Sequence, residues 1–421
     1  MQLRCVGQET ELLMNKFASS LQNPVCTKPS VCGDGHLKIL AIGLRANQKN
    51  NIFSGQAMMF DALVDFLKGC NFYVGTVDLT SKYTNIQIGM LSLKRTLEYI
   101  AIILGSIKLF YKFRGGLLYI TTAQTKAGFL RDLVFVNLAS LFNYKILMQQ
   151  FGSNFEGFYN SLSPFWKYLV RRTFNRGDRI VVEGEITRRQ FSMLDNYAHK
   201  VVAITNGLPE KSLLCSDKGK SYSEGQTFCM IYLSYMIESK GYWDVLEAVR
   251  LLVQEHNKNV HCVFSGAFKH SVDAVMHGNE LEAAAAFKQF IADNNLQAHV
   301  TYHEGLMGEA KAQVFLKANA FLLPSYFRFE GQPVSVLEAM AYGAVPVVTN
   351  YRMISDMVTN DAGLFVEPKS PEQIAEKILF LMNNPASYAS YSQACVDRFL
   401  ANYTLDKYCT NMLQIINRIM V

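Results

Sequence analysis

Cysteine spacing of the metal-binding or redox type is absent from this sequence. Its nine cysteines are scattered, and no two of them are separated by two residues. A chain of this size can stabilise its core without disulfides, so the scattered cysteines predict reduced thiols in a cytoplasmic protein. Asp-x-Asp pairs are also absent, and the eight histidines are dispersed. The sequence therefore predicts neither a metal site nor a metal cofactor.

Long apolar runs are missing as well. The most apolar stretch covers residues 99–107 and ends at Lys108, whereas a helix that spans a bilayer needs about 20 apolar residues. The first 35 residues contain charged side chains and no apolar core of a signal peptide. We therefore expect neither an integral membrane protein nor a secretory signal, and we expect residues 1–35 to form a loosely ordered extension.

Charge is scarce and unevenly distributed. Charged residues make up 18% and hydrophobic residues 50% of the 421 residues, which excludes a disordered chain and favours two globular domains. Residues 1–205 have a net charge of +11, whereas the remainder has −5. The basic half predicts an anionic partner, such as a membrane surface or a phosphorylated acceptor, and we expect no nucleic acid. The alternative is that these cations only form a solvated face.

Short apolar runs alternate with segments of helical periodicity, which predicts an α/β fold of two Rossmann-like domains. Strands are expected at 37–43, 72–78, 117–121, 145–149, 179–182 and 200–204, and again at 228–233, 260–265, 300–303, 320–323 and 345–349. Helices are expected at 56–67, 91–111, 130–141, 242–256, 280–294, 309–318, 334–342, 354–358, 371–382 and 405–420. A turn-rich segment at 206–226 separates the two series. We therefore assign residues 36–210 to an N-terminal domain, 227–400 to a C-terminal domain and 401–421 to a final helix.

A strand, a loop and a helix around Glu330 place polar groups where α/β sheets bind ligands. The loop contains Glu330 and Gly331, and the helix begins near Val334. Ligands of open α/β sheets bind at the carboxyl ends of strands, against helix N-termini. We therefore expect the main-chain N–H groups of Val334 and Ser335 to face a phosphate. Glu338 lies one turn further along the helix, where its carboxylate can accept hydrogen bonds from ribose hydroxyls.

The stretch FEGQPVSVLEAMAYGAVPVV resembles the E-x7-E signature of glycosyltransferase family 4, with Glu330 and Glu338 as its two acids. The resemblance implies the GT-B fold, in which two Rossmann-like domains face each other across a cleft and the final helix crosses back to the first domain. It also implies a retaining hexosyltransferase that needs no metal and uses a nucleotide-sugar as co-substrate, with no other cofactor. Similar bacterial enzymes build surface polysaccharides on glycan or lipid-linked acceptors, so the N-terminal domain is implied to bind the acceptor.

Further family 4 motifs occur along the chain. LSYMIESKGYWDVLEAV resembles the second donor-binding element, which implies that Lys240 holds the donor diphosphate and acts in catalysis together with Glu330. A cation at this position can offset the charge that grows on the leaving group. Gly266 and Gly305 resemble the strand-end turns of the donor site, and Gly55 resembles part of the family's glycine-rich loop.

Four positions depart from the family pattern or match it only in part. Tyr235 stands where many members have an arginine, and Gln149 and Phe151 stand where many have histidines near the donor sugar. Gln149 can still hydrogen-bond a sugar hydroxyl, but it cannot take up a proton. Arg131 lies in a TKAGFLRD segment that resembles those of polysaccharide-building enzymes. Its side chain either faces the cleft, as a sugar or acceptor contact, or only pairs with Asp132.

These departures leave alternatives open. One alternative is a catalytically impaired relative that acts as a scaffold or partner protein. A phosphorylase or a sugar-nucleotide epimerase on the same fold is a weaker alternative, since no motif supports a lysine-bound pyridoxal cofactor. The basic helix 91–111 and the arginines of 171–189 predict contact with anionic lipid on the inner face of the cytoplasmic membrane. Alternatively, this helix is an ordinary buried helix with basic edges.

Overall fold

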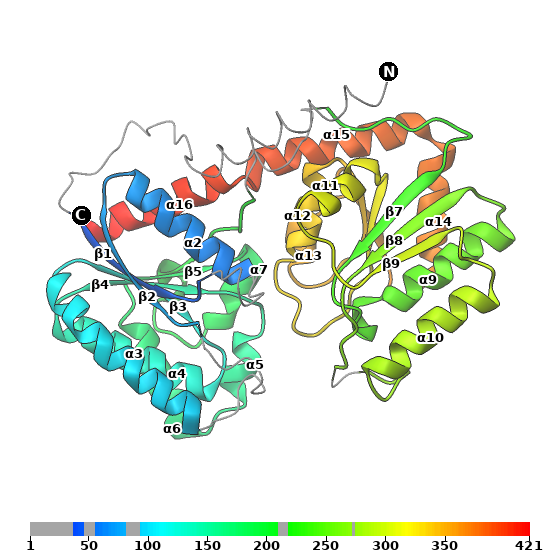
Figure 1. Cartoon of the computed structure of the whole chain (residues 1–421). Coiled ribbons are helices and arrows are strands. Elements are labelled where there is room, and N and C mark those ends of the chain that lie inside the picture. The colour runs from blue at the N-terminus through cyan, green and yellow to red at the C-terminus, as the bar shows by residue number, and fades with distance from the viewer. Residues whose placement is uncertain (1–36, 46–54, 81–92, 209–217, 272–273) are drawn as a thin grey trace, which may run out of the picture.

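Two parallel sheets of six strands each form the framework of the chain (Figure 1). The computed structural model describes residues 37–45, 55–80, 93–208, 218–271 and 274–421. The expected N-terminal extension and part of the expected inter-domain linker lie outside the described residues.

The N-terminal sheet has the strand order β2-β1-β3-β4-β5-β6, and all its pairings are parallel. Its strands are β1 Lys38–Gly43, β2 Tyr73–Asp78, β3 Leu117–Thr122, β4 Lys145–Gln150, β5 Arg179–Val182 and β6 Val201–Ala203. Its helices are α2 Gly55–Gly69, α3 Leu93–Lys112, α4 Lys126–Leu141, α5 Phe155–Asn160, α6 Pro164–Asn175, α7 Glu185–Arg188 and α8 Tyr197–Lys200.

The C-terminal sheet has the strand order β12-β11-β10-β7-β8-β9, again with parallel pairings. Its strands are β7 Phe228–Leu233, β8 Val260–Ser265, β9 Val300–His303, β10 Ala320–Leu323, β11 Val345–Thr349 and β12 Leu364–Val366. Its helices are α9 Tyr242–Arg250, α10 Glu280–Asp293, α11 Gly308–Lys317, α12 Val334–Ala341, α13 Ile354–Met357, α14 Pro371–Asn383 and α15 Pro385–Asn402.

Each face of the N-terminal sheet has its own core, because side chains alternate along a strand. Leu40 and Ile42 face a core shared with α3, α4 and α6. Ile39 and Ala41 face the opposite core, which contains α2 and the last helix, α16 Leu405–Met420. Figure 1 shows the same layers, with α2 and α16 on one side of the sheet and α3, α4 and α6 on the other.

The chain crosses between the two sheets twice, and the two crossings lie side by side. The main-chain N–H of Leu208 donates to the carbonyl of Tyr403 at 2.8 Å, and that of Leu405 donates to Leu208 at 2.8 Å. Gly207 lies so close to this second crossing that a Cβ atom there would be 2.5 Å from the carbonyl oxygen of Thr404. After the second crossing, α16 packs on the N-terminal sheet (Figure 1).

The topology confirms the expected fold of two Rossmann-like α/β units, but several elements were not predicted. The helices α5, α6, α7, α8 and α15 and the edge strand β12 were not predicted, since α7 and α8 have four residues each, β12 has only three, and α15 is rich in serine and tyrosine. Helix α4 begins at Lys126, four residues before the expected start. The hydroxyl of Thr125 caps this earlier start by accepting a hydrogen bond from the N–H of Gly128 at 3.2 Å.

The packing of α16 predicts that its apolar face stabilises the N-terminal domain rather than the domain that precedes it in sequence. Ile416 is fully buried in the core that α2 and α16 form with the N-terminal sheet, so Ile416→Ala should destabilise that domain by about 2–5 kcal/mol. The exposed Gln414 on the same helix provides the control, and Gln414→Ala should change stability by about 0.5 kcal/mol or less.

The sequence has only two tryptophans, and they lie in different domains, Trp166 on α6 and Trp243 on α9. Urea unfolding followed by Trp166 fluorescence in a Trp243→Phe background therefore reports on the N-terminal domain. An unchanged Trp166 transition in Ile416→Ala would contradict the assigned packing.

Candidate active site

An ion pair joins the ends of two strands in the C-terminal sheet. The Nζ atom of Lys240, just after β7, lies 3.0 Å from Oε1 of Glu330, in the loop after β10. The other carboxylate oxygen of Glu330 accepts a hydrogen bond from the hydroxyl of Ser325 at 2.6 Å. The ammonium also lies 5.2 Å from the ring centre of Phe327. Both charged side chains are nearly buried, with 12% and 5% of their surface exposed, so each depends on the other for charge compensation.

Glycine makes this close approach possible. Gly241 follows Lys240 with a φ of +78°, and a Cβ atom there would lie 2.7 Å from the carbonyl oxygen of Pro324. The N–H of Tyr326 donates to the carbonyl of Ser239 at 2.8 Å. The turn before α9 therefore packs directly on the loop that carries Glu330.

Glu338 also has a cationic partner, which the sequence did not indicate. Lys311 on α11 forms an ion pair with Oε1 of Glu338 on α12, and the Glu338 side chain is 13% exposed. The expected hydrogen bond from a ribose hydroxyl to Glu338 stays a prediction. Lys311 would fix the orientation of that carboxylate.

The first turn of α12 lies at the boundary between the two domains. Val334 and Ser335 form this turn, and Pro333 precedes it with an extended backbone. A Cβ atom on Gly55, at the start of α2, would lie 3.3 Å from a methyl group of Val334. A Cβ atom on Gly331 would lie 3.4 Å from the Cα of Gly152. Small residues of the two domains thus meet around the N-terminus of α12.

Two further glycines follow the ends of strands β8 and β9. Gly266 follows β8 with a φ of +150°, and a Cβ atom there would lie 1.9 Å from the carbonyl oxygen of Ser234. Gly305 follows β9 and has open space around its Cα. The N–H of Leu306 donates to the hydroxyl of Ser265 at 2.9 Å. Because β7, β8 and β9 are parallel, the turns that follow β8 and β9 lie at the same edge of the sheet as Lys240.

The other candidate residues are not brought to this loop. Gln149 is fully buried, and its Oε1 accepts hydrogen bonds from the hydroxyls of Tyr119 at 2.5 Å and Tyr408 at 3.0 Å. The side chain of Gln149 therefore joins β4 to α16 within the core instead of facing the cleft. Tyr235 is 58% exposed, and Phe151 packs against the same core as Gln149.

Arg131 adopts the second of its two expected arrangements. Its guanidinium donates to Oδ1 of Asp132 at 2.7 and 2.9 Å, and its carbon lies 5.3 Å from the ring centre of Tyr99 on α3. Burial raises the pKa of Asp132, while the adjacent Arg131 opposes this rise. Arg131 is itself nearly buried, so it joins α4 to α3 and its charge is compensated locally.

The N-terminal domain contacts the Glu330 loop through residues that sequence reasoning did not single out. The hydroxyl of Ser153 donates to the main-chain carbonyl of Glu330. Arg352 donates to the carbonyl of Ser153 at 3.0 Å, and the N–H of Asn206 donates to the side-chain oxygen of Gln332 at 2.8 Å. Two of them had a sequence signal, since Gln332 lies inside the FEGQPVSVLEAMAYGAVPVV stretch and Ser153 follows Phe151 by two residues. No motif indicated Arg352.

A cavity of about 500 Å³ lies beside this contact, between the two domains. Ser153, Asn154 and Gln190 line it from the N-terminal domain, and Tyr351 and Arg352 line it from the C-terminal domain. The cavity is therefore a cleft that opens next to the Ser153–Glu330 contact.

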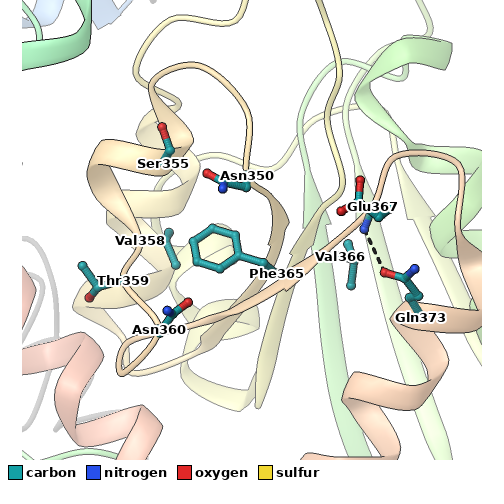
Figure 2. Close-up of a pocket in the computed structure, with 9 residues that line it drawn as sticks. All are labelled: Asn350, Ser355, Val358, Thr359, Asn360, Phe365, Val366, Glu367 and Gln373. Atoms are coloured by element: carbon teal, nitrogen blue, oxygen red, sulfur yellow. Dashed lines mark hydrogen bonds between the residues drawn. The ribbon is translucent and has the colours of Figure 1, made fainter.

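A second hollow of about 540 Å³ lies at β11 and β12 (Figure 2). Phe365 lies among Asn350, Val358 and Asn360, and the N–H of Glu367 donates to the side chain of Gln373 at 2.9 Å. None of the residues that line this hollow was a candidate from the sequence, and it is separate from the Lys240–Glu330 pair.

One segment of the chain contains the Lys240–Glu330 pair, Gly266, Gly305 and the N-terminus of α12, and this segment resembles a known protein family. Residues 216–396 match the family model described as Glycosyl transferases group 1. This match lies in the C-terminal half of the chain and covers less than half of its length. A glycogen synthase from Deinococcus deserti is 28% identical over 144 residues, which are 34% of this chain and 28% of that protein. The chain thus matches little more than a quarter of the length of this curated relative.

Solved glycosyltransferase structures share the two-domain fold. A glycosyltransferase from Rickettsia africae ESF-5 has a TM-score of 0.66 at 15% identity, covering 91% of this chain and 99% of that one. The HepE protein of Anabaena, in complex with UDP, has a TM-score of 0.66 at 11% identity, covering 91% of this chain and 100% of that one. At these identities the likeness is one of fold, and it confirms the expected GT-B architecture.

The burial of the Lys240–Glu330 pair predicts strong coupling between the two residues. Lys240→Met should destabilise the C-terminal domain by about 3–5 kcal/mol, because it leaves Glu330 as an uncompensated buried charge. The double variant Lys240→Met/Glu330→Gln should recover most of this loss, which corresponds to a coupling free energy above about 1 kcal/mol. Urea unfolding followed by Trp243 fluorescence, in a Trp166→Phe background, measures each corner of the cycle. Losses that simply add would contradict the pairing.

Proposed function

We propose that this protein is a retaining glycosyltransferase of the family 4 type. It transfers a hexose from a nucleoside diphosphate sugar to a glycan or lipid-linked acceptor, in the synthesis of a surface polysaccharide. The nucleotide-sugar is a co-substrate, and the reaction uses no metal or other cofactor. The match of residues 216–396 to the group 1 glycosyltransferase family supports the reaction class, and the likeness to HepE in complex with UDP-glucose supports the class of donor.

The observation that carries this proposal is the meeting of Lys240, Glu330 and the N-terminus of α12 at one edge of a parallel sheet. This edge is where open α/β sheets bind phosphorylated ligands. Lys240 supplies positive charge, and the N–H groups of Val334 and Ser335 supply oriented donors. Together they suit a diphosphate that gains negative charge as the glycosidic bond breaks.

Donor binding would change the partners of Lys240. Without donor, the ammonium of Lys240 is compensated by Glu330 at 3.0 Å. A diphosphate beside Lys240 competes for the same ammonium hydrogens, so Glu330 becomes available to a hydroxyl of the donor sugar. The ion pair therefore holds both side chains in position before donor binds, which reduces reorganisation during the reaction.

A catalytically impaired scaffold is the second candidate, and one observation favours it. Tyr235 occupies the place of the family's usual arginine, and its side chain is 58% exposed. The diphosphate would therefore have one cation fewer than in many relatives. Turnover of any nucleotide-sugar by the purified protein, followed as release of nucleoside diphosphate, would exclude this second candidate.

Kinetics should separate the roles of Lys240 and Glu338. Lys240→Ala should lower kcat by about a hundredfold or more, because this cation faces charge that grows in the transition state. Glu338→Gln should raise the donor KM with little change in kcat, because ribose hydroxyls change little during the reaction. The exposed Lys288 on α10 supplies the control, and Lys288→Ala should change neither constant.

Near-normal turnover of Lys240→Ala at saturating donor would show that the assigned role is wrong. Binding of free nucleoside diphosphate by Glu338→Gln as tight as that of the parent protein would contradict the ribose assignment.

We further propose that helix α3 docks on an anionic membrane and brings the active site to a lipid-linked acceptor. Five large side chains at helical spacing of three and four residues are 41–62% exposed on this helix, namely Leu97, Ile100, Leu104, Ile107 and Tyr111. Lys94, Lys108 and Lys112 are exposed on the same helix. Such an apolar stripe with flanking cations suits a bilayer with anionic headgroups. Within the described ranges, no helix combines the length and apolarity needed to cross a membrane.

Liposome flotation tests this docking surface. The double variant Leu104→Glu/Ile107→Glu should reduce recovery on anionic liposomes by about tenfold or more, since it removes apolar area and adds repulsion. The matched control is Leu281→Glu, which changes a leucine on α10 that is 84% exposed in the other domain. For the parent protein, equal recovery on neutral and anionic liposomes, or recovery on neither, would refute the proposal.

A further inference from the structure

Arg352, which lies just after β11, donates hydrogen bonds across the boundary between the two domains. One nitrogen of its guanidinium, Nη1, lies 3.0 Å from the main-chain carbonyl oxygen of Ser153 and 3.3 Å from the Ser153 hydroxyl oxygen. The same hydroxyl donates to the main-chain carbonyl of Glu330. Ser153 of the N-terminal domain is therefore held by two segments of the C-terminal domain, the turn after β11 and the loop after β10.

The two contacts of the Ser153 hydroxyl depend on each other. A hydroxyl has one hydrogen to donate, but it can also accept. Because a guanidinium can only donate, the approach of Arg352 directs the hydroxyl hydrogen of Ser153 toward the carbonyl of Glu330. Arg352 thus orients the hydroxyl that bonds the main chain of Glu330, the residue that pairs with Lys240.

The backbone of Arg352 is in a conformation that arginine rarely adopts. Its φ is +47°, in the left-handed region where a side chain costs free energy and glycine does not. Seven described residues other than glycine have a positive φ, and five of them are asparagines, which tolerate this region better than most residues. The exceptions are Arg352 and Lys369. A glycine at position 352 would relieve the strain, but it could not reach Ser153.

The charge of Arg352 strengthens the contact with Ser153 rather than a salt bridge. Among the described residues, no aspartate or glutamate forms an ion pair with Arg352. Its Nε donates to the hydroxyl of Tyr351 at 3.2 Å, and its guanidinium carbon lies 5.5 Å from the centre of that ring. Hydrogen bonds from a charged donor are stronger than neutral ones, so a cation suits a contact that has to join two domains.

We propose that Arg352 is a positioning residue, which holds Ser153 against the main chain of Glu330 and so keeps the candidate active site assembled while the two domains are in contact. The link to turnover rests on the proposed function, whereas the link to the domain contact does not. Because the side chain is kept at a strained backbone position, its removal should affect stability and activity differently.

Replacement by glycine separates the backbone of residue 352 from its side chain. Arg352→Gly removes the hydrogen bonds to Ser153 and relieves the positive φ, so the urea midpoint of the C-terminal domain should stay unchanged or rise. Trp243 fluorescence in a Trp166→Phe background measures this midpoint. Lys369→Gly is the matched control, because it relieves the strain at φ +58° outside the contact with Ser153. Arg352→Lys is the conservative variant, since it keeps both a cation and the strain.

Hydrogen exchange measures the domain contact and needs no substrate. The main-chain N–H of Asn206 in the N-terminal domain donates to the side-chain oxygen of Gln332 in the C-terminal domain at 2.8 Å. Exchange at Asn206 therefore requires the boundary between the domains to open. Arg352→Gly should accelerate this exchange by about fivefold or more. Lys369→Gly should leave it unchanged, and Arg352→Lys should give a rate between these two.

Kinetics test the link to catalysis. With UDP-glucose as donor, followed as release of UDP, Arg352→Gly should lower kcat by about tenfold or more with little change in the donor KM. Arg352→Lys should retain more of the kcat than Arg352→Gly, although it keeps the backbone strain. Ser153→Ala breaks the same contact from the other domain, so the double variant Arg352→Gly/Ser153→Ala should lose no more kcat than the larger of the single losses.

Unchanged exchange at Asn206 in Arg352→Gly would overturn the proposal. A lowered urea midpoint together with faster exchange at Tyr326, whose N–H donates to the carbonyl of Ser239 within the C-terminal domain at 2.8 Å, would also overturn it, because Arg352 would then only stabilise its own domain. Losses of kcat that add in the double variant would contradict the shared contact. If the parent protein releases no UDP from UDP-glucose, the proposed function fails for this donor, and hydrogen exchange alone then decides the role of Arg352.

Discussion

Two charges that are nearly withdrawn from water, on Lys240 and Glu330, determine the organisation of the candidate site. Each requires the other, since an isolated buried charge is destabilising by several kcal/mol. The pair can form only because parallel strands place all their carboxyl ends at one edge of the sheet, so that the turn after β7 meets the loop after β10. Gly241 permits the close packing of these two segments. A second ion pair, between Lys311 on α11 and Glu338, lies one helical turn into α12.

The second constraint is that polar main-chain groups at the domain boundary need partners. Here the partners come from the opposite domain: the hydroxyl of Ser153 donates to the carbonyl of Glu330, and the N–H of Asn206 donates to the side-chain oxygen of Gln332. The same loop that carries the C-terminal charges is thus completed by the N-terminal domain. The two crossings of the chain, at Leu208 and Thr404, lie beside each other.

The two domains differ in whether the motifs found in the sequence meet in the structure. In the C-terminal domain, the segments that resemble family 4 also meet in space. In the N-terminal domain, Gln149 and Arg131 occupy places where a family resemblance suggests contact with sugar or acceptor, yet both side chains are held by neighbours within the domain. The exposed apolar side chains of α3 instead indicate a surface of this domain that binds a partner.

The sequence by itself determined the two α/β series, most strand positions and the loop of Glu330 before the N-terminus of α12. These follow from local causes: strands and helices have different periodicities, and a strand–loop–helix unit places its loop at the sheet edge. Lys240 was indicated only by the resemblance to glycosyltransferase family 4. Only the tertiary structure decided which side chains compensate one another. Asn206 and Gln332 are 126 residues apart, and Tyr408 and Gln149 are 259 apart. Periodicity indicates that a face is buried, but not what covers it, so neither the packing of α16 on the N-terminal sheet nor the contact of Asn206 with Gln332 could be derived from local pattern.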